Sequence, residues 1–172
     1  MALLVVVLGA TFTLLAVGTR TATRDQAFAN EIADAEAGVG RMVHEIRQAS
    51  SVTATTPNSI DFLVTIGGQA RRVFYECDVA RPASSYRECV RLSAAVGASL
   101  PALSTGAPIV PRIANGTSAD PVFTFSPNAI APTFVQVTLK LPAAGDLAGG
   151  QGLAHNTELH SGVYLRNLDV GA

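Results

Sequence analysis

Residues 2–18 read ALLVVVLGATFTLLAVG, and they decide the fold that this sequence predicts. The run contains no charged residue, and the first charge in the chain is carried by Arg20. As a helix the run would be about 26 Å long at 1.5 Å per residue, close to the roughly 30 Å thickness of a hydrocarbon core. We therefore interpret residues 1–19 as one half of a long helix, buried in a bilayer or among copies of itself.

The large apolar side chains of this half are expected to be buried in the membrane or against the same helix of neighbouring copies. They are Leu3, Leu4, Val5, Val6, Val7, Leu8, Phe12, Leu14, Leu15 and Val17. A cleaved signal peptide is one alternative, although no basic residue precedes the run and no good cleavage site follows it. A buried core helix is the other, but nothing else in the chain looks able to surround the run on all sides.

Residues 20–50 are predicted to continue the same helix as an amphipathic half that ends near Ser50. No proline interrupts residues 21–49, and apolar residues recur at alternating steps of four and three, which is the spacing of one helical face. This face is predicted to pack on a sheet of the same chain, while a weak two-stranded coiled coil is the alternative. It comprises Phe28, Ile32, Ala35, Val39, Met42, Ile46 and Ala49.

Residues 51–172 predict a small antiparallel β domain. Residues 60–66 and 70–77 read as two strands around Gly67-Gly68, which is a strong signal for a hairpin turn. Further strands are predicted at 88–92, 122–125, 134–141 and from Leu159 to about Leu168. Residues 101–132 hold six of the nine prolines and are predicted to be mostly irregular.

The predicted fold class is α+β. A sheet with one apolar face and a helix with one apolar stripe can bury each other. The expected architecture is therefore a long N-terminal helix whose amphipathic half packs on an antiparallel sheet, while its apolar half projects from the domain.

The composition argues against several classes of function. Apolar residues make up 48% of the chain, charged residues 15%, and the net charge is −1. This balance disfavours a disordered chain, and it disfavours nucleic acid as a partner because phosphate binding needs a basic excess. No residue set has the spacing of a metal site or a catalytic triad, so neither a cofactor nor an enzymatic activity is predicted. Asn115-Gly116-Thr117 matches a glycosylation acceptor, but a turn is the favoured interpretation.

The two cysteines, Cys77 and Cys89, are predicted to form a disulfide. They lie twelve residues apart, at the ends of two strands expected to be neighbours. A bond closing a loop of this size stabilises a fold by about 3 kcal/mol in chain-entropy models, and such bonds persist outside the cytoplasm. Two buried free thiols are the alternative.

Three stretches of the chain carry a resemblance to a known family. The first is the apolar run that passes without interruption into the amphipathic helix. The second is residues 41–50, RMVHEIRQAS, and the third is residues 159–167, LHSGVYLRN. These resemble the helix end and the last strand of type IV pilin-like proteins, and most closely those of a minor pseudopilin of the type II secretion J type.

The resemblance implies a structural subunit of a type IV pilus or a type II secretion pseudopilus. Such a subunit spans the cytoplasmic membrane once, holds its C-terminal domain outside the cytoplasm and assembles by helix packing. Its partners would be other pilin or pseudopilin subunits, the membrane and an assembly platform. The protein could also reach the cell surface as part of a filament.

The chain departs from the family at its N-terminus. Prepilins have a basic leader and a Gly that is cut by the prepilin peptidase, followed by Phe-Thr-Leu-x-Glu. Here residues 12–16 read FTLLA, with Thr11 in place of the Gly and Ala16 in place of the Glu. We expect Met1 to be an internal start, or upstream residues to be missing. The peptidase is a partner only if such a leader lies upstream.

A second class of function fits the same sequence. The chain could be a single-pass, membrane-anchored binding module that faces away from the cytoplasm and has no role in a filament. Residues 101–132 would then hold its ligand.

Overall fold

A computed structural model of the chain describes residues 2–81, 84–142 and 155–166. Within these ranges the side chains of residues 2–18, 20, 21, 23, 24, 155 and 156 are not described. The ten side chains predicted to be buried in membrane or filament therefore lie outside the described part.

Helix α1 runs from Ala2 to Arg47 without a break. The chain divides into two compact units, residues 1–33 and residues 34–172. The first unit consists of α1 alone. The second contains the last turns of α1 together with all eight strands of the chain that the structure describes.

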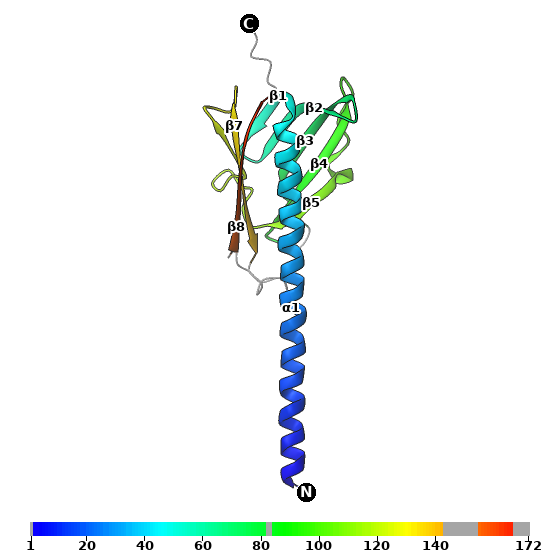
Figure 1. The fold of residues 1–172 in the computed structure, drawn as a ribbon, viewed down its shortest axis with the longest axis vertical. Coiled ribbons are helices and arrows are strands. Elements are labelled where there is room, and N and C mark those ends of the chain that lie inside the picture. The colour runs from blue at the N-terminus through cyan, green and yellow to red at the C-terminus, as the bar shows by residue number, and fades with distance from the viewer. Residues whose placement is uncertain (1, 82–83, 143–154, 167–172) are drawn as a thin grey trace. The chain divides into compact units, whose positions relative to one another are not determined.

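Five strands form the first sheet, sheet 1, in the order in which they occur in the chain. They are β1 (Ala49–Thr56), β2 (Ser59–Ile66), β3 (Gln69–Ala80), β4 (Arg87–Ala95) and β5 (Ala107–Ile113), and Figure 1 shows β2 to β5 side by side. All neighbouring pairs are antiparallel. The predicted hairpin at Gly67-Gly68 is confirmed, because both glycines have positive φ (59° and 78°), as a two-residue turn of this kind requires.

Three strands form the second sheet, sheet 2: β6 (Phe123–Ser126), β7 (Phe134–Pro142) and β8 (His155–Tyr164). The alternation predicted for residues 134–141 is confirmed, since every second side chain of β7 is fully buried. These side chains are Val135, Val137, Leu139 and Leu141. The last strand begins at His155 and ends at Tyr164, earlier than the predicted end near Leu168.

The predicted fold class is wrong. The chain is a β-rich protein with two antiparallel sheets, not an α+β protein in which a long helix packs on one sheet. The side chains of α1 are described throughout only from Asp25 to Arg47. The reason lies in β5. Pro108 and Pro111 have no N–H groups for a further strand, and the carbonyl of Ile109 points at Gly38 of α1. The sheet therefore ends there, and β6 to β8 form a sheet of their own.

Two strands lie where none was predicted. β5 and the 3-10 helix η1 (Leu103–Thr105) fall within residues 101–132, which were predicted to be mostly irregular. A strand can form there because proline is tolerated in an edge strand. β1 begins at Ala49, and only Gln48, which lies in a turn, separates it from the end of α1 at Arg47. Ala49, predicted as the last residue of the apolar helix face, is therefore the first residue of a strand.

The core of the second unit includes the C-terminal turns of α1. Ala35, Val39, Met42 and Ile46 are buried, and so is Ala49 at the start of β1. In the first unit Phe28 and Ile32 are partly exposed. The largest buried side chains of the sheets include Tyr75 and Phe62, whose rings lie 6.0 Å apart.

Gly38 and Gly40 lie two residues apart on α1 but are expected to respond oppositely to alanine. A Cβ at Gly38 would lie 2.6 Å from the carbonyl oxygen of Ile109 and 2.7 Å from Val110 Cγ2, whereas a Cβ at Gly40 meets nothing within 4 Å. Gly38→Ala should lower the free energy of unfolding by about 1–2 kcal/mol. Gly40→Ala should raise it by about 0.5–1 kcal/mol, because alanine favours the helix.

Urea denaturation of the full chain in detergent, followed by circular dichroism, measures both effects. The two variants are matched controls for each other, since they make the same change on the same helix. Equal effects of the two substitutions would contradict the close packing of α1 on β5.

Candidate functional site

A buried ionic cluster fixes the last turns of α1 to sheet 1. Glu45 of α1 faces Tyr75 of β3 and Arg91 of β4, which are direct cross-strand partners. Its Oε2 accepts hydrogen bonds from the Tyr75 hydroxyl (2.7 Å) and from Arg91 Nε (2.9 Å), and its Oε1 accepts one from Arg41 Nε (3.2 Å). The side chains of Glu45 and Arg91 are only 11% and 12% exposed. The carboxylate is thus largely enclosed, and both of its oxygens accept hydrogen bonds.

The electrostatics of this cluster favour an ionised Glu45. Burial on its own raises the pKa of Glu45, but the hydrogen bonds from Arg91 and Tyr75 outweigh it, so the pKa is lower than usual. Burial also raises the pKa of the Tyr75 hydroxyl, and the charge of Glu45 adds to this shift. Tyr75 is therefore a neutral donor and Glu45 a charged acceptor. This arrangement holds an element in place and offers no group poised for proton transfer.

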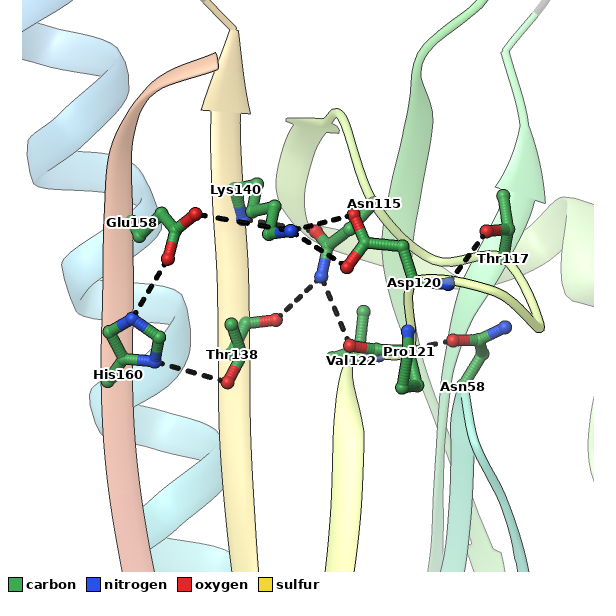
Figure 2. A network of polar contacts seen from close by, with 10 residues as sticks. All are labelled: Asn58, Asn115, Thr117, Asp120, Pro121, Val122, Thr138, Lys140, Glu158 and His160. Carbon is green, nitrogen blue, oxygen red and sulfur yellow. Dashed lines mark hydrogen bonds and ion pairs between the residues drawn. The ribbon is translucent and has the colours of Figure 1, made fainter. Parts of the chain in front are cut away.

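A second polar cluster joins the two sheets, and Figure 2 shows it. The fully buried Asn115 donates through Nδ2 to the carbonyls of Thr138 (2.8 Å) and Pro121 (3.4 Å), and its Oδ1 accepts from the amide of Lys140 (3.0 Å). A single amide side chain thereby ties the loop that follows β5 to strand β7.

Asn58, in the turn between β1 and β2, likewise makes a side-chain hydrogen bond to the backbone, at the residue just before β6. Its Oδ1 accepts from the amide of Val122 (3.2 Å) and its carbonyl from the amide of Cys77 (2.8 Å). The neighbouring carbonyl of Pro57 accepts from the amide of Phe123 (2.8 Å). Sheet 1 and sheet 2 are therefore connected by hydrogen bonds that Asn58, Asn115 and Pro57 make to backbone groups.

A row of charged and polar groups extends from this junction to the surface of sheet 2 (Figure 2). Lys140 Nζ lies 2.9 Å from both carboxylate oxygens of Asp120 and 4.0 Å from Glu158 Oε1. His160 contacts Glu158 Oε2 (3.1 Å) through Nε2 and Thr138 Oγ1 (3.2 Å) through Nδ1. The hydrogen bond from Lys140 to Asp120 is the main reason why the pKa of Lys140 is raised. All these groups are engaged with one another.

The structure places the predicted site residues as follows. Cys77 and Cys89 form the predicted disulfide, between β3 and β4. Asn115 lies in the loop between β5 and β6, beside Gly116 with a φ of +95°, and its side chain is buried inside the protein. Residues 101–132 are only partly irregular, because they contain η1, β5 and β6. Among the described residues no group of three or more His, Cys, Asp and Glu could hold a metal ion.

The sequence interpretation did not identify Glu45, Asn58, Tyr75 or Arg91 as site residues. Glu45 could have been noted as an acidic residue next to the apolar face of the predicted helix, between Met42 and Ile46. Its partners on sheet 1, Tyr75 and Arg91, lie 30 and 46 residues further along the chain, so no local pattern could have identified them.

Within the part of the chain whose side chains are described, no helix has both the length and the apolar character that crossing a membrane requires. Comparison of the sequence with protein-family models and with curated proteins, and of the fold with solved structures, finds no match.

Proposed function

We propose that this chain is a structural subunit of a type IV pilus or of a type II secretion pseudopilus. Residues 2–18 would anchor it in the cytoplasmic membrane by a single pass. In the assembled filament they would pack against the same residues of neighbouring subunits. The β-rich unit would face away from the cytoplasm, where its disulfide can persist.

One observation carries this proposal. The 17 uncharged residues of the apolar run belong to a helix that continues without a break to Arg47, in the second unit. A helix satisfies its own backbone hydrogen bonds, so it can be transferred into lipid or into a bundle of helices without leaving polar groups unpaired. Within such a bundle the contacts would be van der Waals contacts between apolar side chains.

The clusters in the second unit support a mechanical role. The Glu45 cluster holds α1 to sheet 1 through two hydrogen bonds, from Tyr75 and Arg91, to one carboxylate. A subunit that is held by its helix needs such a firm connection between the helix and the globular part. The resemblance of residues 41–50 to the prepilin helix end includes Glu45 itself.

Cross-linking in cells tests the proposal. The full chain carrying Leu8→Cys or Leu15→Cys would be expressed and its membranes treated with a mild oxidant. We expect disulfide-linked dimers from both variants, because the two positions lie on one face of the helix, two turns apart. The matched control is Ala98→Cys, in an exposed turn after β4.

Absence of dimers at both helix positions would overturn the proposal, and so would equal yields at Ala98. A subunit that is anchored but remains monomeric would instead be a membrane-tethered binding module.

A further inference from the structure

The chain contains a single Asn-Gly pair, Asn115-Gly116, and the fold makes specific use of both residues. The buried side chain of Asn115 donates to the carbonyls of Thr138 and Pro121 and accepts from the amide of Lys140 (Figure 2). Two donors and an acceptor on one short, uncharged side chain are what asparagine provides. The junction between the loop after β5 and strand β7 therefore needs an amide at this position.

Gly116 is required for a different reason. Its φ of +95° is a conformation that residues with a side chain rarely adopt. A Cβ atom at this position would also collide with the carbonyl oxygen of Cys77, and it would lie only 3.2 Å from Ile113 Cδ1. The fold thus places glycine directly after a buried asparagine.

An asparagine followed by glycine is chemically labile, because glycine has no side chain to hinder attack by its own backbone nitrogen. In this reaction the nitrogen of Gly116 bonds to the side-chain carbonyl carbon of Asn115 and closes a five-membered imide ring. The bond from that carbon to Nδ2 breaks, and the departing nitrogen takes up the proton of Gly116 and leaves as ammonia. Water then opens the ring, giving aspartate when it attacks the side-chain carbonyl and isoaspartate when it attacks the backbone carbonyl.

The folded protein holds every reacting group away from this path. The N–H of Gly116 donates to the carbonyl of Asp120 (3.0 Å), so the proton that must leave is engaged. The side-chain amide of Asn115 is fixed by its three hydrogen bonds and cannot turn toward Gly116 without breaking them. Both residues are buried, which keeps hydroxide and water from the ring carbons.

We propose that Asn115 is a deamidation site that the fold conceals, and that its modification prevents the second unit from refolding. A carboxylate at this position has no N–H for the carbonyls of Thr138 and Pro121, and its charge would be buried against two carbonyl oxygens. Isoaspartate also lengthens the backbone by one carbon just before Gly116, where the space is taken. The inference is independent of the proposed function, since it depends only on residues of the second unit.

Parallel incubations of the full chain in detergent, with the disulfide intact, test the first half of the proposal. One sample is kept folded in mildly alkaline buffer, and the other is unfolded in the same buffer with urea. Peptide mass spectrometry and enzymatic methylation of isoaspartate measure the modified fraction at Asn115. We expect the reaction to be at least about 100-fold slower in the folded chain, because only opened molecules react. Asn128, which precedes an alanine in an exposed loop, should react slowly in both samples.

Refolding tests the second half. Urea is removed at intervals, and the recovered fold is measured by circular dichroism and by its urea midpoint. The fraction that refolds should fall in step with the fraction of intact Asn115. The matched control is the same time in mildly acidic urea, where the Gly116 nitrogen keeps its proton, and it should refold completely. Asn115→Asp should fail to regain the native urea midpoint without any incubation.

Each half of the proposal can fail separately. Equal rates of modification at Asn115 in the folded and the unfolded sample would show that the fold does not conceal the site. Chains that carry aspartate or isoaspartate at this position and still recover the native urea midpoint would show that the modification does not block refolding. An equal loss of refolding in acidic urea would assign that loss to unfolding itself, and it would overturn the second half as well.

Discussion

Replacing Glu45 with alanine is expected to lower the free energy of unfolding by about 3 kcal/mol. The substitution leaves Arg91, whose side chain is only 12% exposed, without its carboxylate, and it removes the acceptor of the buried Tyr75 hydroxyl. A charge that remains buried without a partner costs more than the pair contributes when it is intact. Urea denaturation of the full chain in detergent, monitored by circular dichroism, gives the value.

Glu36→Ala is the matched control for this prediction. Glu36 lies on the same helix and is exposed, so its removal should change the free energy of unfolding by no more than about 0.5 kcal/mol. A loss below about 1 kcal/mol for Glu45→Ala would show that the cluster does not fasten α1 to sheet 1.

Replacing Asn115 with alanine should lower the free energy of unfolding by about 2–4 kcal/mol. The carbonyls of Thr138 and Pro121 and the amide of Lys140 would each lose a partner in a place that water does not reach easily. The effect should be visible locally as well, because amide exchange of Lys140 should become faster. Thermal denaturation and hydrogen exchange of the same preparation measure the two effects.

Asn128→Ala provides the comparison for Asn115. Asn128 also accepts two backbone hydrogen bonds, but in an exposed loop where water can replace it, so the loss should stay below about 1 kcal/mol. If both asparagine variants lose the same free energy, Asn115 does not connect the two sheets in the way described above.

Local sequence patterns predicted several elements of this fold correctly. The hairpin at Gly67-Gly68 and the alternation in β7 depend on turn chemistry and on a period of two, which a few neighbouring residues determine. The disulfide between Cys77 and Cys89 could be predicted for the same reason, since one short loop joins their strands.

The division into two sheets could not be predicted in this way. Whether β5 continues a sheet depends on Pro108, Pro111 and the approach of Gly38, which is about 70 residues away in the chain. The prolines alone suggested an irregular segment. The same applies to the two polar clusters: Asn115 is typical of a turn, and only the folded chain brings the backbone of β7 within its reach.

Residues 2–18 are proposed to form a membrane and filament helix, and alkaline extraction of membranes tests this directly. Cells would express the full chain as wild type, as Leu8→Arg and, for control, as Ala98→Arg. The wild type and Ala98→Arg should stay in the membrane pellet. Leu8→Arg should be released in large part, because an arginine in the middle of a spanning helix costs about 3 kcal/mol. A wild-type chain that is extracted into the soluble fraction, or a Leu8→Arg variant that remains in the pellet like the wild type, would contradict the account.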